Sequence, residues 1–220
     1  SMGQIKHGSG TITGQFDISG ALDAPKVIGD VKFNQAAFNV AYANSYFKMP
    51  NETISFTEKG INFNNFTIID SLNQRATING GILTSNYQDF NFNMDIRTRN
   101  FRVMNSTAAD NELIYGTVFL TSTISVRGDL NRPDVDMDLR VEDKTKFFFA
   151  MPPTDPSIID QEGIVQYIDA DVAPFNNQKA LNASDSISKA PVKGMNLAAT
   201  IAIDPNAELS VVVDPENGDA

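Results

Sequence analysis

The 220-residue chain has no cysteine and no tryptophan, and its one histidine is His7. Without cysteine there is no disulfide, no thiolate nucleophile and no cysteine-ligated metal centre. A single histidine leaves almost no material for a Ser-His-Asp triad or a histidine-rich metal site. These absences argue against an enzyme. They leave the redox compartment open, because an oxidising compartment does not require cysteine.

Cationic residues are also scarce, with 17 Lys and Arg against 27 Asp and Glu and a net charge of −10. Such a chain is repelled by nucleic acid and by an acidic membrane surface, so we expect neither as a partner. No run of about 18 apolar residues occurs, so no membrane-spanning helix is expected. Ser1 and Met2 resemble the remnant of an expression tag, so the lack of a signal peptide or anchor in this sequence says nothing about the natural protein.

The dominant positive signal is alternation of apolar and polar residues. Ile12 and Phe16 fall on one face of a strand, while Thr11 and Thr13 fall on the other. The same period-two pattern recurs along the chain between turn signals such as Asp204-Pro205-Asn206. It predicts an all-β protein of about eleven half-buried, mainly antiparallel strands. A lipocalin-like barrel, a sandwich and one long curved sheet would all accommodate these strands.

The alternating apolar residues form a candidate site, because together they would build one continuous apolar face. An open groove and a closed sandwich core both require such a face. The residues assigned to it are Ile12, Phe16, Ile18, Val31, Phe33, Ile54, Phe56, Ile78, Ile82, Phe90, Phe92, Met94, Ile96, Val118, Leu120, Ile124, Val126, Val135, Met137 and Leu139.

One short motif occurs twice, at residues 20–27 and 128–135, with the shared pattern G-x-L-x-x-P-x-V. Each copy lies between two alternating segments, so we interpret it as a connection between strands. The glycine is expected to take an unusual backbone angle, and the proline is expected to fix the return of the chain. The leucines, Leu22 and Leu130, are expected to seal the end of the apolar face.

The alternation breaks between residues 150 and 192. After a proline-rich connection, residues 157–169 are expected to form one short amphipathic helix beginning near Asp155. Residues 174–192 are rich in Asn and Ser and are expected to form a polar, flexible loop.

No residue pattern supports a metal site, a cofactor site or a catalytic centre. Asp134, Asp136 and Asp138 resemble the start of a calcium loop, but Leu139 and Thr145 stand where that loop needs glycine and glutamate. We therefore interpret the three aspartates as the solvent-exposed face of a strand. Paired carboxylates for sugar hydrolysis are available, yet there is no tryptophan for sugar stacking.

Two further clusters have alternative interpretations. Arg97, Arg99 and Arg102 lie near Phe101, and an exposed charged turn is favoured over a docking spot for a lipid headgroup or an acidic neighbour. Three consecutive rings at residues 147–149 break the alternation, and a fully buried strand is favoured over an exposed apolar rim.

Two segments resemble the TamB C-terminal domain family. Residues 10–33 repeat the order strand, G-x-L-x-x-P, strand, and residues 194–220 contain an acidic proline turn, a strand and the ending D-P-E-N-G-D. The second segment, together with Ile158 to Asp169, is similar to members from Bacteroidetes-type bacteria. The resemblance implies a single β-taco, a bent sheet with an apolar concave face, over residues 1–220.

The resemblance also implies a function. Family members are expected to be anchored in the inner membrane of a diderm bacterium and to cross the periplasm towards an Omp85-type barrel, which regions outside this chain would contact. Expected partners are phospholipid acyl chains or unfolded outer-membrane protein strands, with roles in phospholipid transport, outer-membrane protein assembly or both. No catalytic residues and no cofactor are implied. The alternative from another class is a secreted β-sandwich adhesin or carbohydrate-binding module.

Overall fold

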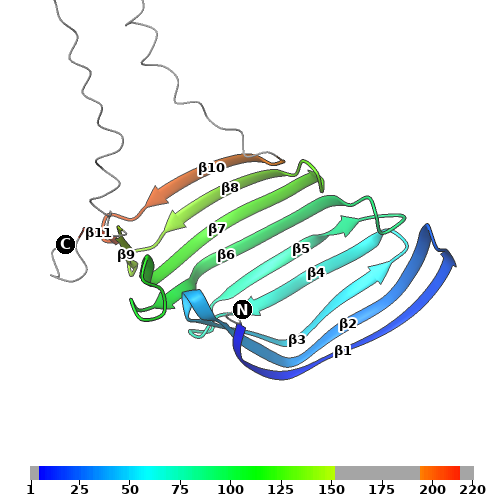
Figure 1. The fold of residues 1–220 in the computed structure, drawn as a ribbon, viewed down its shortest axis with the longest axis horizontal. Coiled ribbons are helices and arrows are strands. Elements are labelled where there is room, and N and C mark those ends of the chain that lie inside the picture. Colours follow the sequence, from blue (N-terminus) through cyan, green and yellow to red (C-terminus); the bar gives the residue numbers. More distant parts are fainter. Residues whose placement is uncertain (1–4, 152–193, 214–220) are drawn as a thin grey trace, which may run out of the picture. The chain divides into compact units, whose positions relative to one another are not determined.

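The computed structural model describes residues 5–151 and 194–213, which form eleven strands and one short 3-10 turn, η1 (Ala41–Ala43) (Figure 1). The strands are β1 (Ile5–Ala21), β2 (Ala24–Val40), β3 (Ser45–Thr57), β4 (Gly60–Ile69), β5 (Arg75–Leu83), β6 (Asn91–Ser106), β7 (Ile114–Asp129), β8 (Asp134–Val141), β9 (Lys146–Ala150), β10 (Asn196–Ile203) and β11 (Glu208–Val212). The all-β prediction is therefore confirmed. The helix expected at 157–169 and the loop expected at 174–192 lie outside the described residues.

All strands belong to one sheet, with the order β1-β2-β3-β4-β5-β6-β7-β8-β10, while β9 pairs with β7 and β11 pairs with β9. Every pairing is antiparallel except β8 with β10 and β9 with β11. Because β8 and β9 both pair with β7, they act as two halves of one interrupted strand, and β10 and β11 follow them in the same way. Within the described residues β1 and β10 each have one free side, so the sheet is open and is not a barrel.

The strand register carries the apolar residues to one face, because directly opposed residues in a sheet point to the same side. One row of opposed residues runs from β2 to β10 as Val31, Ile54, Phe63, Gly80, Met94, Val126, Val135 and Leu197. A second row runs from β4 to β10 as Phe66, Ile78, Ile96, Ile124, Met137 and Ala199.

Irregular residues bend several strands. Asn65 in β4 and Asn100 in β6 have φ values of 50° and 48°, and the register shifts beside each of them. Each bulge returns the next apolar residue to the same face. The rings of Phe63 and Phe66, three residues apart, therefore meet edge to face with centroids 5.9 Å apart.

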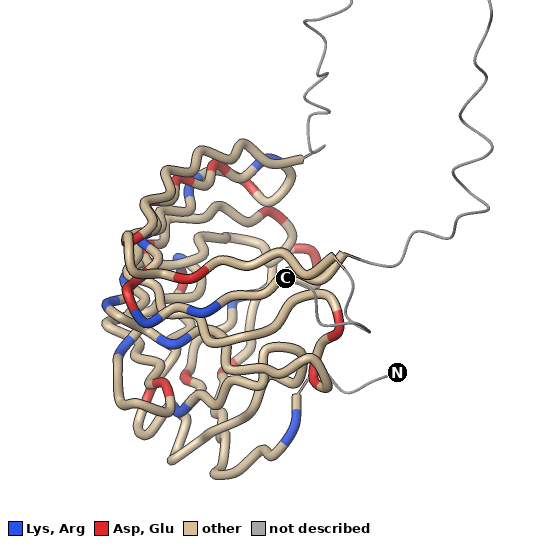
Figure 2. Tube along the Cα trace, turned by 90° about the vertical axis from the view of Figure 1, so that its left-hand side faces the viewer, with Lys and Arg blue, Asp and Glu red and all other residues tan. Residues whose placement is uncertain are grey.

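The apolar face is the concave face of the sheet. Seen nearly along the strands, the sheet is C-shaped (Figure 2). Across the concave side, the Phe47 ring of β3 stacks on the Phe101 ring of β6 with centroids 5.6 Å apart, although β4 and β5 separate these strands in the sheet order. Ala36, Met49 and Phe66 form the small buried cluster on this side.

The two copies of the repeated motif behave partly as expected. Gly20 and Gly128 have φ values of 90° and 86°, and Pro25 lies at the start of β2, so the backbone roles are confirmed. The expected seal is wrong for Leu22, which is 103% exposed, whereas Leu130 is 54% exposed, less than Ile18 on the apolar face, and its role stays a prediction. Both leucines lie in the connection beyond the last pair of opposed residues.

The expected buried strand at residues 147–149 is also wrong. Phe147 lies opposite Gly116 on the apolar side, Phe148 stacks on Tyr115 on the other side, and Phe149 is 42% exposed. In the described residues β9 is flanked only by β7 and β11, with no second layer over it.

The three arginines lie within β6 and not in the expected turn. Arg97 and Arg99 are exposed on this strand, whereas Arg102 is partly buried and its backbone N–H donates to the Asp70 carboxylate at 2.7 Å. Asp70 is fully buried and also accepts the N–H groups of the turn that joins β4 to β5. Arg102 therefore contributes to the turn structure of the sheet.

Candidate functional site

The structure brings the sequence-predicted apolar residues together on one side of the sheet. All of them except Phe90 lie in strands, and the pairings from β1 to β8 place those strand residues on one side, with Ile12 of β1 opposite Phe33 of β2. Phe90 precedes β6, where its ring meets that of Tyr87 with centroids 6.5 Å apart. The predicted strand residues thus lie on one apolar face from β1 to β8, and its rows continue onto β10.

Exposure rises from the middle of this face towards its edges. Phe66 and Phe101 are 4% and 5% exposed, whereas Ile18 on β1 is 72% exposed and Ile201 on β10 is 60% exposed. A sandwich would cover such residues with a second layer, and residues 5–151 and 194–213 contain no second layer. The closed-sandwich alternative is therefore not supported by the described part of the chain.

One end of the face narrows into an apolar pocket of about 520 Å³. Val40, Ala43 and Phe47 line it from β2, η1 and β3, and Ile203 and Leu209 line it from β10 and β11. The two wings of the curved sheet therefore converge on this pocket. Its lining is apolar apart from Thr145 and the ring-bearing Tyr42.

Most of the pocket lining was missed by the sequence analysis, which assigned only Val118 to the apolar face. The alternation at Ile201, Ile203 and Leu209 is visible in the sequence, but their side of the sheet depends on the parallel pairing of β10 and β11. Phe47 follows η1, and its position depends on the packing of β3 against β6.

Polar contacts close the narrow end. The Ser45 hydroxyl donates to the Val103 carbonyl at 2.9 Å, and the Asn44 side-chain amide donates to the Asp110 carboxylate at 3.3 Å. Backbone and hydroxyl hydrogen bonds from Thr107 lower the pKa of Asp110 below its ordinary value, so this carboxylate stays charged at neutral pH. These contacts fix the start of β3 against β6.

One carboxylate falls on the apolar side by register. Glu52 lies opposite Phe33, and its carboxylate accepts the backbone N–H of Thr67 at 2.8 Å beside the bulge of β4. This bond satisfies a backbone donor that the bulge leaves without a strand partner. Alternation with Ile54 and Phe56 already places Glu52 on this face, and the sequence analysis overlooked it; only its hydrogen bond with Thr67 depends on the bulge of β4.

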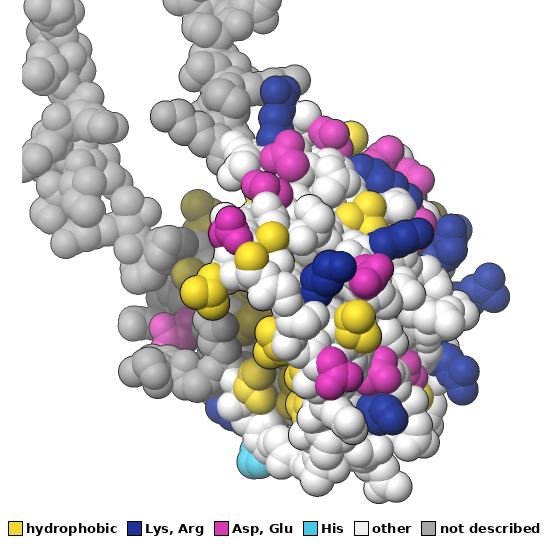
Figure 3. Space-filling view, turned by 90° about the vertical axis from the view of Figure 1, so that its right-hand side faces the viewer, with side chains coloured by type: hydrophobic (Ala, Val, Ile, Leu, Met, Phe, Trp, Pro, Cys, Tyr) yellow, Lys and Arg dark blue, Asp and Glu magenta, His cyan; other side chains and the backbone are white. Residues whose placement is uncertain are grey.

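The convex face is polar and carries charges of both signs. Viewed from the end that holds the β1–β2 turn, basic side chains project mainly from one side and hydrophobic side chains gather towards the other (Figure 3). Asp95 accepts a hydrogen bond from Arg127 at 2.7 Å, and this bond is the main reason that the pKa of Asp95 is lowered. Asp134, Asp136 and Asp138 are exposed on β8, as expected.

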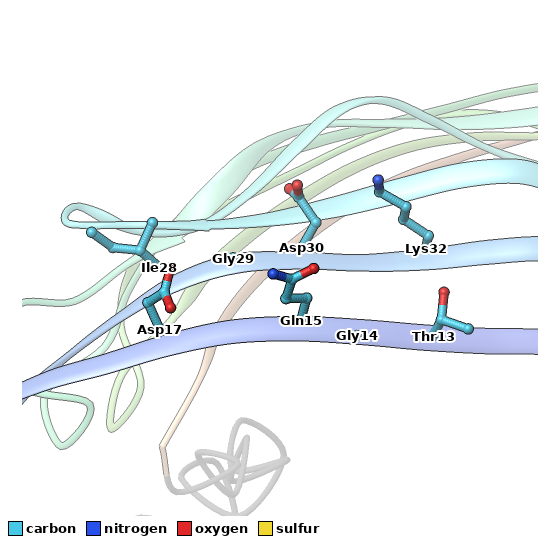
Figure 4. A pocket seen from close by; sticks show the side chains of 8 residues that line it. All are labelled: Thr13, Gly14, Gln15, Asp17, Ile28, Gly29, Asp30 and Lys32. Carbon is cyan, nitrogen blue, oxygen red and sulfur yellow. The ribbon is translucent and has the colours of Figure 1, made fainter.

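A hollow of about 480 Å³ on the polar side of β1 and β2 includes Gly14 and Gly29 in its lining (Figure 4). Gln15, Asp17 and Lys32 point into it from β1 and β2, and Asp30 beside them accepts the Ser55 hydroxyl at 2.7 Å. The mixed charge does not define a cation or anion site. No group of three metal-ligating side chains was found in the described residues.

The fold and the apolar face together define a class: an open, curved β-sheet with one apolar concave surface. Within the described residues, no helix is long and apolar enough to cross a membrane. A family model described as the TamB C-terminal domain matches residues 64–218, and the chain belongs to this family. No curated protein and no solved structure matches the chain.

Membership of this family indicates a general function. TamB proteins are non-enzymatic modules of the bacterial envelope, and they act in membrane-related transport or assembly. A role of this kind fits a sheet that offers an extended apolar surface.

Proposed function

We propose that this chain is a periplasmic segment of a bridge between the inner and outer membranes, in which the concave apolar face holds phospholipid acyl chains during transport. The full-length protein would be anchored in the inner membrane, and regions outside this chain would contact an Omp85-type barrel. The observation that carries the proposal is the apolar face itself, which stays uncovered in the described residues and leads into the pocket beside Phe47 and Leu209.

The energetics of lipid transfer require such a face. Each CH₂ withdrawn from water contributes about 0.8 kcal/mol, so a 16-carbon chain contributes about 13 kcal/mol. A lipid that leaves a bilayer must retain nearly all of this free energy, which demands a continuous apolar surface. Residues such as Ile18 and Ile201 are more than half exposed and would lose that exposure against an acyl chain.

Native mass spectrometry and lipid extraction of the purified chain test this proposal. We expect co-purifying phospholipid, and we expect its loss when Phe92→Asp and Leu120→Asp are combined. These changes place two carboxylates on the apolar face, where contact with an acyl chain would cost several kcal/mol. The matched control is Asn93→Asp combined with Thr123→Asp, which adds the same charges to the same strands on the polar face.

Circular dichroism must show that both double variants keep their strand content. A lipid-free chain that also ignores vesicles of added phospholipid would overturn the proposal. Equal lipid loss in the polar-face control would overturn the assignment of the concave face.

Assembly of outer-membrane proteins is the second candidate function. It is favoured by the two free strand edges of the described sheet, since an extended segment of another protein can add to such an edge by backbone hydrogen bonds.

A further inference from the structure

The two free edges of the sheet differ in character. The β1 edge contains Lys6, His7 and Asp17, and its register is broken by shifts on both sides of Ser9. Bulges and charged residues of this kind discourage pairing with another strand. The β10 edge has neither feature: Asn196–Ile203 reads N-L-A-A-T-I-A-I, without charge, glycine or proline, and pairs with β8 without a register shift.

β10 has backbone hydrogen-bonding groups that have no strand partner in the described residues. The Asn196 N–H donates to the Pro133 carbonyl at 2.9 Å, which fixes the alternation of this parallel ladder. The N–H and C=O groups of Leu197, Ala199, Ile201 and Ile203 therefore point away from β8. Within the described residues no strand pairs with them, and every side chain of β10 is exposed.

The surface behind this edge carries two exposed carboxylates. Asp136 and Asp138 on β8 lie opposite Ala198 and Thr200, whose side chains are too short to cover them. Among the ion pairs of the described part, neither aspartate has a basic partner. A hollow of about 260 Å³ lies over Thr200 and Ala202 and reaches Asp138 and Arg140. Arg140 is already paired with Glu142 and Asp204.

We propose that the β10 edge accepts an extended segment of another protein that alternates apolar residues with Lys or Arg. The apolar residues would extend the rows that now end at Leu197, Ala199 and Ile201. The basic residues would lie two strand spacings from Asp136 and Asp138, about 10 Å at the backbone, which a long cationic side chain can span over the small residues of β10.

Charge argues against a second copy as the occupant. The regular part of β1, residues 11–21, contains no Lys or Arg, and neither does β10. Pairing two β10 edges would bring together the carboxylates of both copies. The proposal rests on the second candidate function in needing strand addition, and it adds the edge and the charge of the incoming segment.

Binding of synthetic peptides to the full chain tests the proposal. The probe is a peptide of about nine residues that alternates valine with lysine, and the matched control replaces every lysine with glutamate. We expect the lysine peptide to bind at least about tenfold more tightly, with the difference shrinking at about 0.5 M NaCl. Hydrogen exchange should slow at the amides of Leu197, Ala199, Ile201 and Ile203.

Two variants separate the contribution of backbone pairing from the contribution of the carboxylates. Ala199→Pro removes an outward-pointing N–H without removing a bond to β8, so it should abolish peptide binding while lipid co-purification persists. Asp136→Asn combined with Asp138→Asn should abolish the preference for lysine while leaving the edge intact.

Equal binding of the two peptides would overturn the proposed basic segment and leave strand addition standing. If neither peptide binds, or if hydrogen exchange slows at β1 in place of β10, both the basic segment and strand addition at β10 are overturned. Protection of the β10 amides in the chain alone would show that the chain itself or a second copy occupies the edge, which also overturns the proposal; its concentration dependence would tell these two occupants apart.

Discussion

Thr145 joins β8 to β9 at the point where the strand beside β7 is interrupted. Its side chain is 1% exposed, its hydroxyl accepts the Phe119 N–H at 3.1 Å, and no other acceptor for this N–H is present in the described residues. Replacing Thr145 with valine keeps the shape but removes the acceptor. A buried donor left without a partner costs about 1–3 kcal/mol.

The expected loss lies near the middle of that range. The Phe119 carbonyl still accepts the N–H of Glu142 at 3.0 Å, so the Phe119 N–H alone loses its partner. A loss of about 2 kcal/mol would lower the melting temperature by about 4–8 °C for a chain of this size. Thr145→Ser keeps the hydroxyl and removes one methyl group, so it should lose only about 0.8 kcal/mol.

Urea denaturation followed by circular dichroism measures both variants. The valine variant is expected to have the lower free energy of unfolding of the two. If the serine variant were equally or more destabilised, the methyl packing and not the hydroxyl would hold this joint.

Three further predictions follow from other parts of the sheet. Leu22→Ser should change the free energy of unfolding by less than about 0.5 kcal/mol in a thermal melt, because Leu22 is fully exposed; a larger loss would mean that it does seal the apolar face. Gly80→Ala should cost at least about 2 kcal/mol in urea denaturation, because a Cβ there lies 2.0 Å from the Asn93 carbonyl oxygen and φ is +99°; an unchanged midpoint would contradict this close approach. Arg127→Gln should raise the pKa of Asp95 measured by NMR titration, and an unchanged pKa would refute the dominant role of Arg127. The lowered pKa implies that this contact stabilises the fold above the unfolded-state pKa of about 3.9, and that the contribution is lost as the pH falls through the folded-state value.

The alternation of residues predicted the all-β class and the membership of the apolar face. These follow from a local rule, since residues two apart in a strand share a side. The same rule could not locate the bulges at Asn65 and Asn100, because a left-handed residue inside a strand depends on its partner strand. The expected role of Leu22 as a seal is also wrong, because Leu22 lies in a connection beyond the last pair of opposed residues and is fully exposed.

The pocket could not be predicted from any short segment of the sequence. Phe47 and Leu209 meet only because the sheet curves and because β11 pairs in parallel with β9. Thr145, which occupies the glutamate position of the incomplete calcium-like motif, instead satisfies the backbone of β7. The sequence pattern therefore predicted which residues are greasy and which side they share, while curvature and strand order decide where they form a cavity.

Curvature also connects stability with the proposed function. A flat sheet with one apolar face would leave all its inward residues equally exposed, whereas here Phe66 and Phe101 are almost completely buried without a second layer in the described residues. The middle of the face thus stabilises the chain by its own packing, and the residues towards the free edges, such as Ile18 and Ile201, retain most of their exposure. Because burial of the remaining apolar area is what an acyl chain would gain, these rim residues should contribute most to lipid binding and least to folding.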